Sequence, residues 1–324
     1  MQKLRIGIVG YGNIGRGVEK AVAAAPDMEL TAVVTRRAPK SLQTATQTAK
    51  VIAMDDILTL KGEVDVLLLC GGSATDLPVQ GPQLARDFNI VDSFDTHAKI
   101  PEYLKEVDAQ AQHTTAVISS GWDPGLFSII RALSGAVLPD GTGYTFWGKG
   151  VSQGHSDAIR RVKGVAKAVQ YTVPVESAVD AVRGGQNPVL TTRQRHLRDC
   201  WVVAEAGADL RRIERDIQTM PHYFADYDTT VHFIDEADFA ANHTTMPHGG
   251  KVFHGGNTGK NRHMIEFSLT LDSNPEFTGS VMVAYARAAA RMAGEGLFGA
   301  KTVLDIPPVY LSLQSRAALI QELL

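Results

Sequence analysis

The 324-residue sequence predicts an α/β fold in which a doubly wound parallel sheet carries an inserted α+β domain. Short, uninterrupted apolar runs alternate with helical segments in the first third, as is typical of parallel strands covered on both faces. After residue 121 the strands become longer and more polar, and the loops are rich in glycine and histidine. This change divides the chain into a first domain, residues 1–121 with about 273–324, and a second domain, residues 122–272.

The first domain contains five apolar runs that we predict to be strands. They cover residues 4–9, 30–35, 64–70, 89–94 and 115–120. After the first run, Ile14, Val18 and Val22 repeat at the spacing of one helix face. Helices between such strands form βαβ units, which predict the doubly wound sheet.

The second domain is predicted to hold a mostly antiparallel sheet with one face in water, because apolar and polar residues alternate in "TVHFID" and "MIEFSLTL". A helix is expected over "RRIERDIQTMP", ending near Pro221. An Ala-rich helix over "SVMVAYARAAARMA" follows and ends near Gly294. The last fifty or so residues are expected to pack back on the first domain.

Composition excludes several classes of function. The net charge of −3, with 44% hydrophobic and 21% charged residues, gives no indication of a nucleic-acid or anionic-membrane partner. No secretory signal or membrane-length apolar run is visible. The two cysteines, Cys70 and Cys200, cannot form a disulfide framework and fit a reducing compartment. We therefore expect a cytoplasmic protein.

A complete G-x-G-x-x-G motif is formed by Gly10, Tyr11, Gly12, Asn13, Ile14 and Gly15. It follows an apolar strand directly and opens a helix, which is the context that a dinucleotide site requires. In such a Rossmann-type domain, the glycines permit the tight turn, the approach of the pyrophosphate and close packing of helix on strand. The alternative is a plain glycine-rich turn.

The end of the second predicted strand indicates which dinucleotide binds. NAD sites of this kind carry a carboxylate there, but this chain has Thr35, Arg36 and Arg37, and Glu29 lies where the strand begins. Two guanidinium groups match the 2′-phosphate of NADP through charge-assisted hydrogen bonds. We therefore predict NADP as the cofactor, with a solvated basic turn as the alternative.

Later strand ends are expected at the same cleft, because ligands bind outside the carboxyl ends of parallel strands. The segment "CGGSATD" is small enough to lie along the nicotinamide ribose. The segments "VDSFDTH" and "SSGWDPG" bring Asp92 or Asp95 and Asp123 to the place of hydride transfer. Each aspartate is alternatively a cap or turn residue, and Trp122 is a substrate wall or a core residue.

The second domain offers groups that suit a substrate with more than one carboxylate. "FWGKGVSQGHSD" places Trp147 before a glycine-rich loop whose backbone N–H groups can face an anion. Arg198 and His248 add side-chain donors, although each alone is as readily a structural residue. No H-E-x-x-H spacing supports a metal, and neither cysteine has an adjacent base for thiol acylation.

These segments resemble the meso-diaminopimelate dehydrogenase family over nearly the full chain, most specifically in "GWDPG", "SQGHSD", "TTMPHGG" and "DSNPEFT". "SQGHSD" and the insert "AVRGGQNPVLTTRQRH" are similar to its longer, substrate-strict branch. The resemblance implies that the first domain binds the dinucleotide, and that the second domain binds the substrate and joins two copies of the chain into a homodimer. It also implies a place in lysine and diaminopimelate biosynthesis. Its implied reaction is reversible, NADP-dependent oxidative deamination of the D-centre of meso-2,6-diaminopimelate to L-2-amino-6-oxopimelate, ammonia and NADPH.

The resemblance also implies roles for individual residues. The NADP site would comprise the glycine motif, Thr35 to Arg37, and Cys70, Gly71, Gly72, Ser73, Ser93 and Phe94. The D-centre would be surrounded by Asp92, Asp95, Trp122 and Asp123, with Asp123 or Asp92 assisting deprotonation. The rest of the substrate would contact Trp147, Gln153, Gly154, Thr172, Arg198, His248 and Asn274.

Two alternatives remain at this point. One is a reductase or dehydrogenase for another substrate, such as a sugar oxidoreductase or dihydrodipicolinate reductase; the Glu-Lys-Pro usual in the sugar group is replaced here by "SGWDPG". The other is an NADP-sensing protein without catalysis, which needs neither two acidic strand ends nor a carboxylate clamp.

Overall fold

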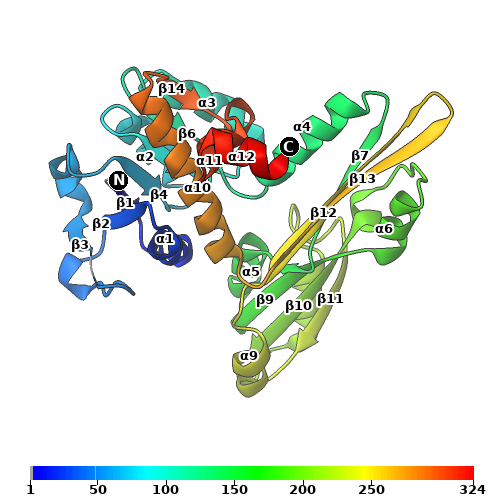
Figure 1. Ribbon diagram of the computed structural model, residues 1–324. Helices are drawn as coiled ribbons and strands as arrows, with labels where there is room; N and C mark the ends of the chain where they lie inside the picture. Colours follow the sequence, from blue (N-terminus) through cyan, green and yellow to red (C-terminus); the bar gives the residue numbers. More distant parts are fainter. Residues whose placement is uncertain (1–2, 48) are drawn as a thin grey trace. The chain divides into compact units, whose positions relative to one another are not determined.

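The computed structural model describes residues 3–47 and 49–324, and the chain divides into two compact units (Figure 1). Unit 1 comprises Met1–Ile129 and Pro275–Leu324, and unit 2 comprises Ile130–Asn274. The first division lies inside helix α4 (Leu126–Val137), whereas the sequence changes character after residue 121. No helix in the described part of the chain has the length and apolar character needed to cross a membrane.

Unit 1 is built on a seven-stranded parallel sheet in the order β14-β6-β5-β4-β1-β2-β3. The strands are β1 (Leu4–Val9), β2 (Met28–Thr35), β3 (Lys50–Ala53), β4 (Val66–Leu69), β5 (Ile90–Asp92), β6 (Thr115–Val117) and β14 (Gly299–Lys301). Strand order reverses at β1, which lies between β4 and β2, and this is where such sheets bind ligands. The predicted doubly wound sheet is confirmed, with β3 and β14 added at its edges.

Helices cover both faces of this sheet because the side chains of each strand alternate. Ile8 points into the cluster that holds Tyr285 of α10, and Val9 points into the opposite cluster with Tyr103 of α3. The helices of unit 1 are α1 (Asn13–Ala24), α2 (Leu77–Ala85), α3 (Ile100–Asp108), α10 (Asn274–Gly294), α11 (Pro308–Leu311) and α12 (Arg316–Leu323). Short 3-10 turns occupy Pro39–Ser41, Met54–Leu60, His97–Lys99 and Val303–Asp305.

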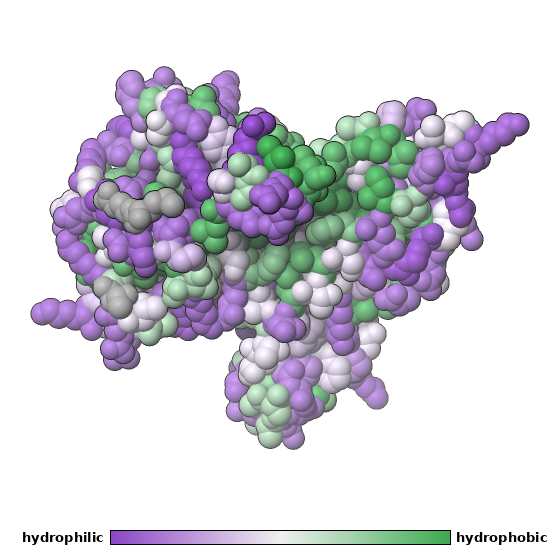
Figure 2. All heavy atoms as spheres, viewed as in Figure 1, coloured by the Kyte–Doolittle hydropathy of each residue, from purple (hydrophilic) through white to green (hydrophobic). Residues whose placement is uncertain are grey.

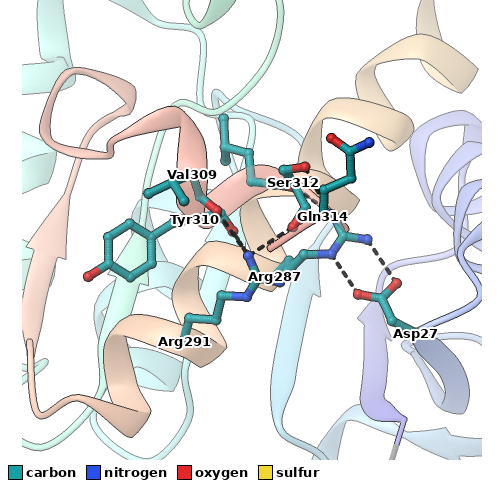
Figure 3. A network of polar contacts seen from close by, with 8 residues as sticks. Asp27, Arg287, Arg291, Val309, Tyr310, Ser312 and Gln314 are labelled. Carbon is teal, nitrogen blue, oxygen red and sulfur yellow. Dashed lines mark hydrogen bonds and ion pairs between the residues drawn. The ribbon is translucent and has the colours of Figure 1, made fainter. Parts of the chain in front are cut away.

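Two arginines of α10 fasten the carboxyl-terminal segment (Figure 3). Buried Arg287 donates to both carboxylate oxygens of Asp27, at 2.6 and 2.9 Å, and to the carbonyl of Leu311. The Nη1 atom of Arg291 donates to the carbonyls of Val309, Tyr310 and Ser312 at 3.0, 3.1 and 2.8 Å. Asp27 directly precedes β2, so Arg287 joins α10 and the end of the chain to the parallel sheet.

Unit 2 holds two sheets rather than the single one expected. An antiparallel sheet in the order β13-β12-β7 contains β7 (Thr142–Trp147), β12 (His248–Thr258) and β13 (Asn261–Leu271). A second sheet in the order β11-β10-β9-β8 contains β8 (Gly150–Val151), β9 (Val165–Pro174), β10 (His196–Ala204) and β11 (Asp228–Phe233). β10 and β11 are parallel because α8 crosses between them, so the α+β prediction is confirmed with a mixed second sheet.

Helices cover the sheets of unit 2 unevenly. The helices are α5 (Gln153–Arg160), α6 (Glu176–Arg183), α7 (Thr192–Arg195), α8 (Leu210–Gln218) and α9 (Glu236–Asn242). α5 and α8 contribute Ile159 and Ile213 to a core with Cys200, and Phe239 of α9 packs near Tyr171 on the other face. Figure 2 shows apolar residues over α4 and hydrophilic residues at the free end of the β12–β13 hairpin.

Candidate active site

The turn after β1 shows why three glycines are spaced as they are. Gly10 has φ +91°, a conformation that L side chains rarely adopt. A Cβ on Gly15 would lie less than 3.0 Å from the Gly10 carbonyl oxygen, so only glycine lets α1 start this close to β1. A Cβ on Gly12 would meet nothing within 4 Å, so the space in front of this residue is open to a ligand.

A cavity of about 450 Å³ lies in front of this turn, at the carboxyl ends of β1, β2 and β4. Its wall contains ten of the predicted cofactor residues: Gly10, Tyr11, Gly12, Asn13, Thr35, Arg36, Arg37, Cys70, Gly71 and Gly72. It also contains Arg16 and Asp76, which the sequence analysis missed. Asp76 was recognisable as the last residue of "GSATD", but nothing in the sequence showed its partner.

The other predicted cofactor residues lie outside this cavity wall, as far as the structure describes it: Ile14, Gly15, Ser73, Ser93 and Phe94. Phe94 is a core residue whose ring centroid lies 4.3 Å from that of Tyr103. The Ser73 hydroxyl accepts a hydrogen bond from the backbone N–H of Asp95 at 2.7 Å. Ser73 and Phe94 thus contact other parts of unit 1, and the cofactor roles of these five residues stay predictions.

Arg36 and Arg37 follow β2 and line the cavity. Each already has a hydrogen-bonding partner, which a bound phosphate can replace or bind beside. Arg36, whose side chain is 69% exposed, pairs with Asp76 at 2.9 Å. The Asp76 carboxylate also accepts the N–H of Gly72 at 2.9 Å. Arg37 donates to the carbonyl of Tyr11 at 2.8 Å. Two positive groups without a carboxylate in residues 35–37 fit the 2′-phosphate of NADP better than the bare ribose of NAD.

Glu19 anchors the cofactor side of unit 1 and was not predicted. Its buried carboxylate accepts hydrogen bonds from the Tyr11 hydroxyl, from the N–H of Ala45 at 3.1 Å, and from the N–H and hydroxyl of Thr46 at 2.7 and 2.6 Å. Burial raises the pKa of Glu19, but the hydrogen bonds from Thr46 and Tyr11 outweigh it and the net shift is downward. The ionised side chain thus ties the segment after β2 to α1.

Asp92 does not have the environment expected of a catalytic residue. Its fully buried carboxylate accepts the N–H groups of Phe94 and Ser119 at 3.0 and 2.9 Å, and the Tyr103 hydroxyl at 2.6 Å. Ser119 has φ +56°, and the bond to Asp92 helps to hold this strained turn. Burial raises the pKa of Asp92, against the hydrogen bonds that lower it. Asp92 is therefore better described as positioning the loops after β5 and β6 than as touching a substrate.

Asp95 and Asp123 lie on the two loops that Asp92 fastens. Asp95 is exposed and Asp123 is half-buried, so both carboxylates differ from Asp92 in being reachable by solvent. Trp122 is buried, and its ring packs edge-on against Phe127 with centroids 5.2 Å apart. Trp122 thus packs in the core of unit 1, and its role as a substrate wall stays a prediction.

In unit 2, the short strand β8 gathers the predicted substrate residues. Gly150 pairs with Thr172 of β9, which in turn pairs with Arg198 of β10. A Cβ on Gly150 would lie less than 3.0 Å from the His248 ring, so this imidazole packs directly on the Gly150 backbone. Gln153 is the first residue of helix α5, which corrects the expected glycine-rich loop. Residues from three strands and one helix thus meet around β8.

Trp147 is the last residue of β7, and Asn274 is the first residue of α10. Trp147 is 37% exposed, stacks on the His196 ring at 5.4 Å, and donates its backbone N–H to that ring at 2.9 Å. Asn274 begins α10 and donates its N–H to the carbonyl of Met246 at 2.9 Å. The side-chain amide of Gln153 reaches the sulfur of the same methionine at 3.1 Å.

Arg198 is the buried positive charge of this region. Only 6% exposed, it donates from Nη1 to the Thr172 hydroxyl, and its Nε has no partner among the described residues. Burial and the charge of Arg198 lower the pKa of His155 to about 4, and together with Arg195 they do the same to His196. Because both imidazoles are neutral at pH 7, the positive charge here comes from arginine, and Arg198 is the buried one, suited to one carboxylate.

Gln170, in unit 2, is a further polar residue that the sequence analysis missed. It lies on the same face of β9 as Thr172, is fully buried, and neither its amide oxygen nor its nitrogen has a partner in the described structure. Buried polar groups of this kind usually bond to a ligand or an ordered water molecule. The free thiols are different, because burial raises the pKa of Cys70 and Cys200 and keeps both protonated. No cluster of metal-ligating side chains occurs among the described residues.

Comparison with known proteins decides the family. The model of the oxidoreductase family with an NAD-binding Rossmann fold matches residues 4–91, and that of the diaminopimelic acid dehydrogenase C-terminal domain matches residues 121–273. The meso-diaminopimelate D-dehydrogenase of Lysinibacillus sphaericus is 59% identical, covering 100% of both chains. The Acetivibrio thermocellus enzyme is 57% identical, covering 100% of this chain and 98% of its own. The chain belongs to the meso-diaminopimelate D-dehydrogenase family.

Solved structures of this family have the same fold. The Corynebacterium glutamicum DAP dehydrogenase in complex with DAP has a TM-score of 0.92 and 48% identity, covering 100% of both chains. An engineered D-amino acid dehydrogenase bound to NADP+ has a TM-score of 0.88 and 46% identity, also covering 100% of both. The predicted family, fold and type of enzyme are confirmed, and the sugar-oxidoreductase and dihydrodipicolinate-reductase alternatives are excluded. The substrate-strict branch stays a prediction.

Proposed function

We propose that the chain catalyses reversible, NADP-dependent oxidative deamination at the D-centre of meso-2,6-diaminopimelate. The products are L-2-amino-6-oxopimelate, ammonia and NADPH, within lysine and diaminopimelate biosynthesis. The observation that carries the proposal is Arg198, a buried guanidinium without a carboxylate partner among the described residues. Such a charge is costly to bury unless an anion joins it, and the distal carboxylate of this substrate is an anion of the right kind.

The cavity of unit 1 is the NADP site in this proposal. Gly12 leaves room for the pyrophosphate beside the start of α1, and Arg36 and Arg37 bind the 2′-phosphate. When bound, NADP supplies a hydride acceptor. A structure of this family that contains NADP+ supports the assignment.

Three residues of unit 2, Thr172, Arg198 and His248, form what we call the substrate clamp. The clamp determines which end of the nearly symmetric substrate reacts. Thr172, Arg198 and His248 hold the distal, L-configured end, while Trp147, Gln153, Gly154 and Asn274 contact the substrate body or close over it. A mutant of the Clostridium tetani enzyme that was crystallised with DAP carries substitutions of Gln, Thr, Arg, Pro, His and Asn. This chain has those residue types in the same order at Gln153, Thr172, Arg198, Pro247, His248 and Asn274, which supports the clamp.

Asp95 and Asp123 serve the reacting end. Their carboxylates bind the ammonium group of the D-centre and orient its Cα–H bond. As the hydride leaves Cα, the nitrogen loses a proton to Asp123 and a C=N bond forms. Water then adds to the imine carbon, ammonia leaves, and the ketone remains. Asp92 keeps both loops in place through its bonds to Phe94 and Ser119.

The homodimer and a cytoplasmic location also belong to this proposal. Along α4 an apolar face is exposed, with Leu133 at 60% and Val137 at 61% (Figure 2). Exposed apolar patches of this kind mark protein interfaces, and a second copy of this chain is the partner that the family resemblance implies. Two free buried cysteines fit a reducing compartment.

The test is initial NADP reduction at alkaline pH with the meso, LL and DD isomers of diaminopimelate, and with NAD in parallel. We expect turnover of the meso isomer with NADP, and little or none with the LL isomer or with NAD. Tight NADPH binding without turnover of any isomer would overturn the proposal in favour of an NADP sensor.

A further inference from the structure

We infer that Tyr227 is a positioning residue of the substrate clamp, because its ring forms the platform on which the Arg198 guanidinium lies. The inference rests on the proposed function and deepens it. Tyr227 belongs to none of the segments that predicted the site, and it lies in the turn between α8 and β11.

The geometry of the pair is that of a cation on an aromatic face. The Cζ atom of Arg198 lies 3.8 Å from the centroid of the Tyr227 ring. Such stacking occupies one flat face of the guanidinium and leaves its N–H edges free for in-plane hydrogen bonds. One edge donor bonds to Thr172, while Nε has no partner in the described structure. The remaining donors are thus available to a carboxylate in the plane.

The charges around Arg198 explain why an aromatic ring, and not a carboxylate, stabilises its guanidinium. No carboxylate pairs with Arg198 among the described residues, and the nearby His155 and His196 are neutral at pH 7. An acidic partner would stabilise Arg198 but would compete with the substrate carboxylate. The aromatic face stabilises the buried cation from one side and leaves Nε and Nη donors for a carboxylate, while hydrogen bonding to the Tyr227 hydroxyl also raises the pKa of Arg198 against the effect of burial. Tyr227→Phe removes that hydroxyl and keeps the ring. Tyr227 therefore holds the charge in place and leaves it unneutralised.

The turn that carries Tyr227 is itself fixed. The backbone N–H of Tyr227 donates to the carbonyl of Phe224 at 2.9 Å. Arg193 bonds to both sides of the residue, to the Asp228 carboxylate at 2.9 Å and to the Ala225 carbonyl at 3.3 Å. A platform held in this way limits the orientations of Arg198 before the substrate arrives, which lowers the entropic cost of binding.

The test replaces Tyr227 with phenylalanine and then with di- and trifluorinated phenylalanines, which keep the ring shape and weaken its negative face. We expect Tyr227→Phe to stay within about 3-fold of wild type in KM for meso-diaminopimelate. Along the fluorinated series KM rises to roughly 3- to 30-fold, the range of a desolvated cation–π contact, while kcat and KM for NADP stay nearly constant. In the Arg198→Met background the same series is flat.

Each outcome is informative. A flat series in an otherwise wild-type chain that turns over meso-diaminopimelate overturns the platform, and so does an equal rise in the Arg198→Met background. Phe239→Leu, a half-buried aromatic change on the other face of the same sheet, is the control and leaves KM unchanged. If the wild-type chain shows no turnover, the proposed function fails first.

Discussion

Replacing Arg36 by alanine tests whether the basic strand end selects NADP. A charge-assisted bond to phosphate contributes about 1.5–3 kcal/mol. Before the phosphate arrives, Arg36 is paired with Asp76 at 2.9 Å with its side chain 69% exposed, and an exposed pair of this kind contributes up to about 1 kcal/mol. Because binding replaces that pair, the net contribution of Arg36 is about 0.5–2 kcal/mol. Arg36→Ala should therefore raise KM for NADP by roughly 2- to 30-fold.

The assay is initial rate against cofactor concentration at saturating meso-diaminopimelate, with NADP and NAD side by side. KM for NAD should change by less than about 2-fold, because NAD lacks the 2′-phosphate. Arg86→Ala is the matched control, since Arg86 is exposed and bonds only weakly to Gln110, at 3.1 and 3.3 Å. An equal rise for both cofactors, or none for NADP, would refute the phosphate assignment.

Three further predictions concern the clamp, the loops and the sheet. Gly150→Ala should raise KM for meso-diaminopimelate by about 10-fold or more, because the new Cβ would lie less than 3.0 Å from the His248 ring and displace it. Asp92→Ala should lower the free energy of unfolding by about 3–5 kcal/mol in urea titrations, because it leaves buried hydrogen-bond donors unpaired. Hydrogen bonding to Arg287 lowers the pKa of Asp27, so the stability that this carboxylate adds is present above about pH 4 and is lost as the pH falls through its folded pKa. The difference in stability between wild type and Asp27→Asn should therefore shrink as the pH falls from about 4 through the folded pKa of Asp27.

Controls separate these effects from general damage. Gly294→Ala should leave KM unchanged, since Gly294 is exposed and its Cβ would meet nothing within 4 Å. Asp95→Ala should change the free energy of unfolding by no more than about 1 kcal/mol, because Asp95 is exposed. It should still lower turnover, because the proposed function places this carboxylate at the reacting end of the substrate. The account of Asp92 is wrong if Asp92→Ala unfolds like wild type and only turnover falls. If the difference in unfolding free energy between wild type and Asp27→Asn does not change with pH, ionisation of Asp27 does not contribute to the loss of stability in acid.

The sequence predicted those parts of the fold that local pattern determines. Long apolar runs such as β1 and β2 are visible because both faces of each strand are buried. Strands β3 and β14 were missed because both are short edge strands, "KVIA" with four residues and "GAK" with three, and such short runs are not distinguishable from loop sequence. Helix α5 was mistaken for a loop because glycine and histidine in "QGHSD" are weak helix formers, and pairing of the preceding β8 with β9 sets its start.

Residue roles were harder to predict where they depend on distant partners. Asp92 lies in the last part of a predicted strand and Asp95 directly follows it, so the sequence alone offers both as candidates at the same strand end. The environments of the two carboxylates differ because Tyr103 of α3 and Ser119, which follows β6, donate hydrogen bonds to Asp92 and cover it. Tyr227 has no local signal at all, because its role comes from a turn that follows α8 and meets Arg198 through space.

The central claim is that the clamp of unit 2 presents only the D-configured centre for hydride transfer. Two samples of meso-diaminopimelate test it, one deuterated at the D-configured Cα and the other at the L-configured Cα. Each is oxidised with NADP, and the reduced cofactor is examined by mass spectrometry. The account predicts deuterium in the NADPH from the first sample and none from the second. Deuterium from the second sample, or from both, would contradict it.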